Sequence, residues 1–170
     1  PGRRLVPKAE MVGRIKAAVD ARVDADLVIV ARTDARTDAG IEAALDRAMA
    51  YAEAGADVLF VESPESEDEM RRITRELSQP CLANQVEGGR TPMFPASQLA
   101  SIGYRLAIYP NSITRLFGRV GKALYDELHA SGSTAAFADR MLDHRALWDL
   151  FEYPSFVETE ARYGGPQQGR

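Results

Sequence analysis

The sequence has a single cysteine, Cys81, and no long apolar run. One cysteine cannot form a disulfide within the chain, and such usage is typical of a reducing compartment, so we expect a cytoplasmic protein. No stretch approaches the roughly 18 consecutive apolar residues that a membrane-spanning helix requires. We therefore expect no membrane partner.

An excess of positive charge is also missing. The chain carries 21 Lys and Arg against 25 Asp and Glu, a formal net charge of -4, and its pI is about 5.3. Proteins that neutralise phosphate backbones carry the opposite excess, so we expect no nucleic-acid partner. The apolar fraction of 45% and the charged fraction of 27% are ordinary for a globular protein and exclude wholesale disorder.

Common nucleotide and metal motifs are absent as well. The segment 88–92 has neither the GxxxxGK[ST] spacing of a phosphate-binding loop nor a GxGxxG pattern, so we interpret it as an ordinary loop. His129 and His144 lack metal-ligand spacing, and we expect both on exposed helix surfaces. The chain starts at Pro1 without a methionine or a signal-peptide pattern. We expect it to be processed or to be part of a longer chain.

What the sequence does contain is a regular alternation of amphipathic helices and short apolar strands. Up to residue 109 we predict strands at 27–30, 58–61, 80–83 and 106–109, and helices at 8–22, 41–54, 66–77 and 96–101. The first of these strands has no polar alternation, which is typical of a strand buried on both faces. Strands that recur every ~25 to 30 residues with helices between them predict βα units and a parallel sheet.

The rest of the chain is predicted to be helical. We expect helices at 112–128, 135–151 and 156–163, and a flexible tail at 164–170. No linker divides this helical region from the βα region that precedes it. Residues 1–163 are therefore predicted to form one domain.

Polar residues follow every predicted strand. In parallel α/β folds the chemistry collects at the carboxyl ends of the strands, because the loops after the strands converge there. A guanidinium, a carboxylate, an amide and a hydroxyl at one such edge predict a polar pocket. The four strand ends are Arg32-Thr33-Asp34, Glu62-Ser63, Asn84-Gln85 and Tyr109-Pro110-Asn111-Ser112.

Each of these residues also has a purely structural alternative. Arg32 and Asp34 could pair with each other or cap a helix. Glu62 could cap the helix that follows it, and Asn84 could form an Asx turn. The residues alone leave these alternatives open.

Motifs around the strand ends resemble the isocitrate lyase/phosphoenolpyruvate mutase superfamily. The similarity covers about residues 1–163, and the motifs stand in the family's order and approximate spacing. The branch that the chain most resembles holds 2-methylisocitrate lyase, the 2-alkylmalate lyases and the carboxyphosphonoenolpyruvate phosphonomutase-like proteins. The motifs lie at 10–11, 15–21, 31–35, 54–57, 60–62, 82–92, 109–110 and Arg115.

This resemblance implies an α/β fold, a parallel (β/α)8 barrel of the TIM type whose last helix is swapped between neighbouring subunits, usually in a homotetramer. The chain would supply the C-terminal half of the barrel, with four strands plus the C-terminal helices. Its partners would be the missing N-terminal half-barrel and further copies of itself. The metal ligands and a cysteine-bearing loop belong to that missing half.

The resemblance also implies roles for the strand-end residues. Arg32, expected to be catalytic with Glu62, would grip a carboxylate of a small-molecule substrate, a task suited to its planar fork. Glu62 would stand beside the metal, Mg2+ or Mn2+, and reach it through water, with no direct metal ligand in this chain. The other expected substrate-binding residues are Asn84, Gln85, Val86 and Arg115.

The implied function is a Mg2+-dependent lyase that cleaves a C–C bond in a 2-hydroxy di- or tricarboxylate, of the 2-methylisocitrate or 2-alkylmalate type, through a 2-oxo acid enolate. His144, with Arg145 beside it, stands where the methylisocitrate enzymes carry an arginine, which favours another side group. A phosphonopyruvate-type P–C mutase or hydrolase is the alternative enzyme, and the missing loop would separate the two. A non-catalytic half-barrel or an open four-stranded sheet is the structural alternative.

Overall fold

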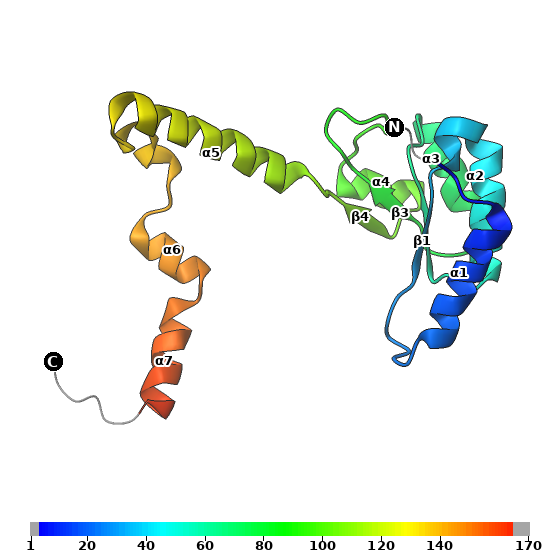
Figure 1. The fold of residues 1–170 in the computed structure, drawn as a ribbon, viewed down its shortest axis with the longest axis horizontal. Helices are drawn as coiled ribbons and strands as arrows, with labels where there is room; N and C mark the ends of the chain where they lie inside the picture. The colour runs from blue at the N-terminus through cyan, green and yellow to red at the C-terminus, as the bar shows by residue number, and fades with distance from the viewer. Residues whose placement is uncertain (1–3, 165–170) are drawn as a thin grey trace. The chain divides into compact units, whose positions relative to one another are not determined.

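The computed structural model describes residues 4–164, and the chain divides into two compact units after Arg115 (Figure 1). The first unit alternates strands with helices, and the second is helical. The elements of the first unit are α1 (Lys8–Ala21), β1 (Val30–Thr33), α2 (Ala35–Glu53), β2 (Val58–Val61), α3 (Glu67–Glu76), β3 (Leu82–Asn84), α4 (Ala96–Ile102) and β4 (Leu106–Ile108). Then follow α5 (Ser112–Ser131), the 3-10 helix η1 (Ala135–Arg140), α6 (His144–Leu150) and α7 (Tyr153–Tyr163).

The strands of the first unit are parallel, as predicted. β1 pairs with β2, with Thr33 opposite Val61, and β3 pairs with β4. A parallel bridge between Leu59 and Cys81 joins the two pairs. Counting three residues on from that bridge brings Glu62 level with Asn84. The register therefore gathers the carboxyl ends of the strands, and the polar residues that follow them, at one edge.

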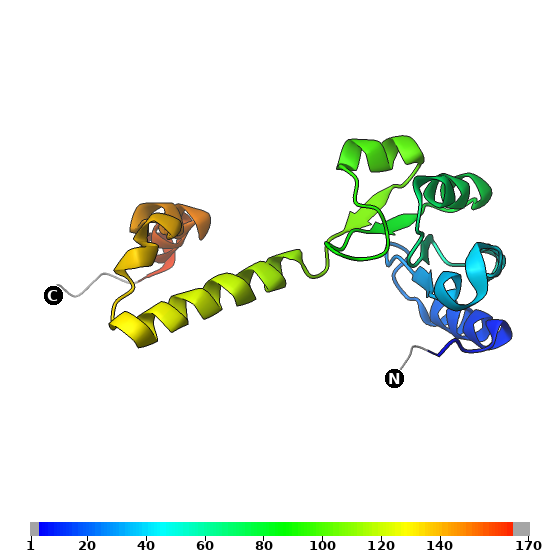
Figure 2. The same cartoon turned by 90° about the horizontal axis from the view of Figure 1, so that it is seen from above.

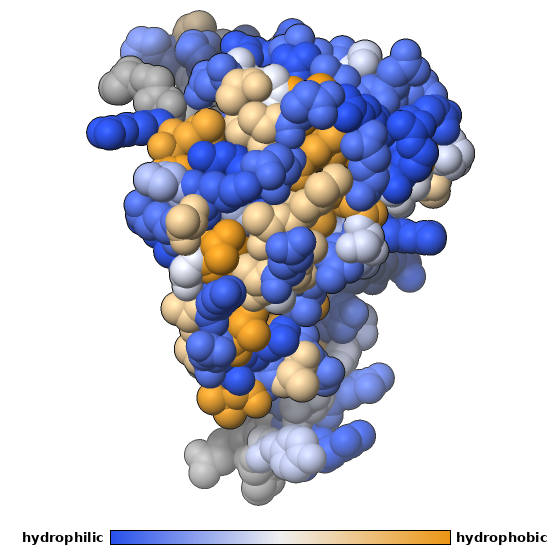
Figure 3. All heavy atoms as spheres, turned by 90° about the vertical axis from the view of Figure 1, so that its right-hand side faces the viewer, coloured by the Kyte–Doolittle hydropathy of each residue, from blue (hydrophilic) through white to orange (hydrophobic). Residues whose placement is uncertain are grey.

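The core of this unit lies between the strands and the helices. In Figures 1 and 2, α1, α2 and α3 lie together on one side of the strands. The strand side chains that face them, among them Leu59 and Val61, pack with buried helix residues such as Tyr51, Met70 and Ile73. A smaller cluster of Val58, Phe60 and Leu82 stands apart from that core, because alternate strand residues point to opposite faces. The outer surface of the helices is largely polar with apolar patches between (Figure 3).

Local sequence signals placed two elements accurately. β2 occupies the predicted residues 58–61, and all four of its residues are buried. α3 begins after Ser66, whose Oγ accepts a hydrogen bond from the backbone N–H of Glu69. This contact is an N-cap interaction, which satisfies a backbone donor left free at the helix start.

The first strand begins three residues later than predicted, and the prediction that both of its faces are buried was wrong. Leu27 and Val28 lie outside the strand and are 58% and 57% exposed, and Val30 is 45% exposed. The strand position follows from pairing with β2, which aligns Val30 with Val58. Within residues 4–164 β1 has a strand neighbour on one side only. The apolar residues that lead into the strand therefore remain exposed to solvent.

Two helix predictions were also wrong in extent. α2 begins at Ala35 instead of residue 41 because Gly40, with φ of +82°, lets two helical segments meet at a kink. The helix predicted at 135–151 is two elements, because Met141 is extended and a new helix starts after Asp143. The Asp143 carboxylate accepts from the N–H of Ala146 at 2.7 Å, which caps that new start.

The helical unit has no buried residue among its described residues, 116–164. Several large aromatic side chains there are at least half exposed, including Phe117, Trp148 and Phe156. The two histidines are exposed on this part of the chain, as expected. No described helix is both long and apolar enough to cross a membrane. Apart from Gly164, the tail predicted at 164–170 lies outside the described residues.

Candidate functional site

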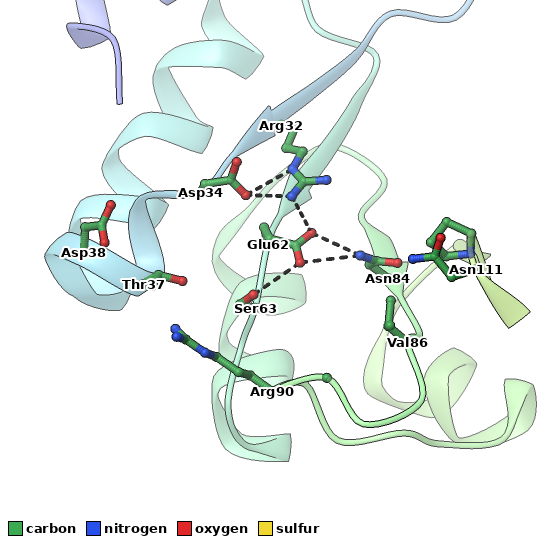
Figure 4. A pocket seen from close by; sticks show the side chains of 12 residues that line it. Arg32, Asp34, Thr37, Asp38, Glu62, Ser63, Asn84, Val86, Arg90 and Asn111 are labelled. Atoms are coloured by element: carbon green, nitrogen blue, oxygen red, sulfur yellow. Dashed lines mark hydrogen bonds and ion pairs between the residues drawn. The ribbon is translucent and has the colours of Figure 1, made fainter. Parts of the chain in front are cut away.

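A pocket of about 670 Å³ opens at the carboxyl ends of the strands (Figure 4). Residues that follow all four strands line it, so the polar pocket expected from the sequence is present. The first turn of α2 and the loop after β3 complete the wall. The lining residues are Arg32, Asp34, Thr37, Asp38, Glu62, Ser63, Asn84, Val86, Gly89, Arg90, Pro110 and Asn111.

Glu62 stands at the centre of the polar contacts, and it is only 9% exposed. Its carboxylate accepts hydrogen bonds from Asn84 Nδ2, at 3.2 Å to Oε2, and from Ser63 Oγ, at 3.2 Å to Oε1. Arg32 Nη2 lies 3.1 Å from Oε2. A buried carboxylate needs such partners, because an isolated charge is costly to remove from water. Glu62 makes no cap for α3, since Ser66 takes that position.

Arg32 bridges two carboxylates. Its Nε and Nη2 donate to Asp34 Oδ1 at 3.1 and 2.8 Å, and Nη2 also faces Glu62. The guanidinium lies over the Phe60 ring, 4.8 Å from its centre. The pairing of Arg32 with Asp34 that the sequence left open is therefore real. The two N–H groups of Nη1 have no partner among the described residues, so they can bind a ligand.

Asn84 has one satisfied and one unsatisfied end. Nδ2 donates to Glu62, while Oδ1 is buried and accepts no hydrogen bond within residues 4–164. In Figure 4 the Oδ1 end points toward Asn111. A buried unpaired acceptor costs about 1–3 kcal/mol, so this oxygen suits a donor from a bound molecule. The Asx turn considered for this residue is not its role, because its amide turns to Glu62.

Ser63 holds a backbone conformation that only the structure reveals. Its φ is +59°, in the left-handed region of backbone conformation that residues other than glycine rarely adopt. Strain of this kind persists where the surroundings fix it, and it concentrates at functional sites. The turn directs Ser63 Oγ at Glu62.

Two of the expected substrate-binding residues do not line the pocket. Gln85 is completely buried, and its Oε1 accepts from the N–H of Phe94 at 2.8 Å. Its Nε2 donates to Pro92 O at 3.5 Å. Arg115 is exposed and donates from Nη1 to Glu87 O at 2.8 Å. Partners distant in the sequence decide where the side chains of Gln85 and Arg115 point. These orientations therefore could not be predicted from the positions of the two residues in the sequence.

Several pocket residues were not predicted from the sequence. Thr37 and Asp38 lie in the first turn of α2, a helix predicted to start later. Gly89 and Arg90 belong to the segment interpreted as an ordinary loop. A usable signal was present, since a lone cation in a glycine-rich stretch directly after a strand end is well placed to reach that pocket.

Two acidic residues of the pocket are turned toward Arg32. Within the described part of the chain no group of three or more His, Cys, Asp or Glu residues could hold a metal ion. Asp34 and Glu62 both face Arg32. Mg2+ requires near-octahedral oxygen ligation, which these carboxylates do not provide by themselves.

Comparison with known sequences gives consistent relatives. The family described as phosphoenolpyruvate phosphomutase matches residues 1–128. The chain is 46% identical over 162 residues to 2,3-dimethylmalate lyase of Eubacterium barkeri, covering 95% of this chain and 56% of that protein. It is 39% identical over 158 residues to 2-methylisocitrate lyase of Escherichia coli K12, covering 93% and 53%. The chain thus spans about half the length of the curated relatives it matches.

Comparison with solved structures gives relatives of the same superfamily. The trigonal crystal form of 2,3-dimethylmalate lyase, a PEP mutase/isocitrate lyase superfamily member, matches with a TM-score of 0.86 at 30% identity, over 96% of this chain and 55% of that one. A phosphonopyruvate hydrolase complex with oxalate and Mg2+ matches with a TM-score of 0.75 at 25% identity, over 94% and 57%. The parallel α/β fold therefore corresponds to part of a TIM-barrel-type structure, and the chain belongs to the phosphoenolpyruvate phosphomutase family.

Proposed function

We propose that this chain forms part of the active site of a C–C bond lyase that cleaves a 2-hydroxy di- or tricarboxylate. The hydroxyl proton is removed and the C–OH carbon becomes the carbonyl of a 2-oxo acid. The electrons of the broken C–C bond leave on the other carboxylate fragment as an enolate, which is then protonated. The observation that carries the proposal is the contact of Arg32, Glu62 and Asn84 at the strand ends. The relatives named 2,3-dimethylmalate lyase and 2-methylisocitrate lyase support this reaction and substrate class.

Each residue of this cluster has a role that its free atoms support. Arg32 Nη1 faces no described partner, so it binds a substrate carboxylate. Asn84 Oδ1 accepts a hydrogen bond from a substrate hydroxyl, which removes its unsatisfied state. Glu62 keeps both side chains oriented through its contacts with Arg32 and Asn84.

The charge of the pocket supports an additional cation. Two arginines and three carboxylates line it, which leaves an excess of one negative formal charge. A dianionic or trianionic substrate would be repelled by that excess. We therefore expect Mg2+ or Mn2+ to be held by ligands outside this chain, with Glu62 near it through water, and when bound the ion stabilises the enolate charge. The phosphonopyruvate hydrolase complex with Mg2+ supports this expectation.

The proposal also includes the other half of the barrel and the neighbouring subunits. We expect residues 1–163 to act as the C-terminal half of a (β/α)8 barrel that pairs with an N-terminal half. Exposed aromatic residues on α5, α6 and α7 support helix exchange within a homotetramer. The buried, unpaired thiol of Cys81 agrees with the reducing cytoplasm.

An assay on the intact protein tests the proposal. 2,3-Dimethylmalate, 2-methylisocitrate, oxaloacetate and phosphonopyruvate would each be incubated with Mg2+, and release of the 2-oxo acid would be followed. We expect cleavage of a hydroxy di- or tricarboxylate that EDTA abolishes. Turnover of phosphonopyruvate alone would favour the P–C mutase or hydrolase. No turnover of any substrate would favour the non-catalytic half-barrel.

A further inference from the structure

We propose that Arg90 is a second carboxylate-binding residue of the pocket, which contacts the substrate carboxylate farther from the one bound by Arg32. This inference rests on the proposed function, because it assigns a binding partner for the same substrate. It makes Arg90 a specificity-determining residue that favours di- and tricarboxylates over monocarboxylates.

Arg90 reaches the pocket with an uncommitted guanidinium. It lies on the loop between β3 and α4 and lines the pocket together with Gly89. In Figure 4 its side chain extends from the loop toward Thr37. Within residues 4–164 the guanidinium forms no hydrogen bond or ion pair, whereas Arg32 already faces two carboxylates. All five N–H donors of Arg90 are therefore available to a ligand.

A glycine turn sets the direction in which Arg90 leaves the loop. The N–H of Gly89 donates to Val86 O at 2.9 Å, and Gly88 has φ of +74°. A Cβ on Gly89 would lie 3.0 Å from Val86 O, too close for comfortable packing. The turn therefore favours glycine at both positions and ends directly on Arg90.

The loop is fastened on both sides of that turn. Downstream, the buried Gln85 side chain holds the backbone at Phe94. Upstream, Glu87 accepts a hydrogen bond from Ser112 Oγ at 2.6 Å and lies 3.6 Å from Arg115 Nη1. The Ser112 hydrogen bond, aided by the charge of Arg115, holds the pKa of Glu87 below its ordinary value. The carboxylate stays charged at neutral pH, so the loop presents Arg90 from a fixed base.

The chemistry of the pocket calls for a second cation at this place. A di- or tricarboxylate has at least two anionic ends, and Arg32 can bind one of them. Arg90 is the other positively charged residue among the pocket lining that the structure describes. Its planar fork matches a carboxylate with two parallel hydrogen bonds. Arg90 is exposed and has no ion pair with any described residue, so binding a substrate breaks none of those contacts.

The test compares Arg90→Gln with Arg105→Gln in the intact protein. Arg105 is an exposed arginine just before β4, at the amino end of the strand, so its variant removes the same charge away from the pocket. With 2,3-dimethylmalate and 2-methylisocitrate we expect Arg90→Gln to raise KM by about tenfold or more, with kcat changed little. Arg90→Lys should restore part of the loss, and Arg105→Gln should leave KM unchanged.

A binding measurement separates carboxylate recognition from other effects. Malate and lactate are both 2-hydroxy acids, but only malate has a second carboxylate. By calorimetry, Arg90→Gln should weaken malate binding about tenfold and leave lactate binding unchanged. Two results would overturn the role of Arg90. One is an equal loss of affinity for both acids, and the other is a KM of Arg90→Gln that equals the KM of an active wild type. A wild type that cleaves neither lyase substrate would overturn the proposed function itself, and this inference with it.

Discussion

Asn84 Nδ2 donates to Glu62 Oε2 at 3.2 Å across the junction of β2 and β3, and Asn84 Oδ1 stays buried without a hydrogen-bond partner among residues 4–164. The strand register produces the contact, because Glu62 and Asn84 come level three residues after the Leu59–Cys81 bridge. One amide thus orients a buried carboxylate with its nitrogen and offers a ligand its oxygen. Because both ends of the amide have a role, we expect substitutions of Asn84 to affect the site.

Asn84→Asp should destabilise the protein more at pH 8 than at pH 5. The change replaces a donor by a second carboxylate within 3.2 Å of Glu62, and two like charges so close repel each other until one is protonated. Thermal unfolding of variant and wild type at both pH values measures the difference. Asn111→Asp is the matched control, since Asn111 lines the pocket on the side away from Glu62. Equal destabilisation at the two pH values would contradict the expectation.

Arg32→Ala should lower both stability and activity. Glu62 would keep only its neutral donors, and we expect a loss of about 1–2 kcal/mol in the free energy of unfolding, less than for a fully buried pair because Arg32 is partly exposed. We expect kcat/KM to fall by about 100-fold or more, since a charged substrate contact is lost. Arg32→Lys keeps the charge without the fork, so it should recover stability better than activity. Urea unfolding and steady-state kinetics give the two readouts.

Ser63→Gly and Ser63→Ala should differ in stability although both remove the hydroxyl that donates to Glu62. Glycine adopts the φ of +59° at this position without strain, whereas alanine does not. We expect the glycine variant to be more stable than the alanine variant by about 1 kcal/mol. Chemical denaturation of the two variants side by side provides the measurement. A more stable alanine variant would show that the backbone here is unstrained.

Gln85→Leu should loosen the loop that carries Arg90. The partly buried N–H of Phe94 would lose its acceptor, which costs about 1 kcal/mol. We expect faster proteolysis of the 86–94 segment together with a higher KM, because Arg90 would no longer project from a fixed base. Gln98→Leu in α4 is the control, because the Gln98 amide donates to Glu67 of α3 and not to the loop, so we expect it to change neither. Unchanged proteolysis in Gln85→Leu would argue that the loop is held by other contacts.

Acid should weaken the link between α2 and α3. Arg36 donates to Glu69 at 2.7 Å, and this hydrogen bond holds the pKa of Glu69 below its ordinary value. A carboxylate with a lowered folded pKa stabilises the fold above its unfolded pKa, and the contribution disappears as the pH falls through the folded value. The stability difference between wild type and Glu69→Gln should therefore shrink from pH 7 toward pH 3. Asp68→Asn, at an exposed neighbouring position, should show little such change.

Much of the fold follows from the sequence because its signals are local. The apolar run at 58–61 becomes β2 at those residues, and Ser66 with Glu69 marks the start of α3. Alternation of strands and helices gave the parallel arrangement, and polar residues after each strand indicated the pocket edge. Arg32, Glu62 and Asn84 were identified in this way, Val86 was expected from the family resemblance, and all four line the pocket.

Tertiary structure decided which side chains meet, because their partners are distant in sequence. Gln85 follows the same strand as Asn84, yet the backbone at Phe94 draws it into the core. Arg115 turns to Glu87, while Arg90 enters the pocket from a glycine turn that local patterns marked only as a loop. The kink at Gly40 and the pairing of β1 with β2 moved two element boundaries. Sequence fixes local propensity and periodicity, whereas hydrogen-bond partners across strands depend on register and packing.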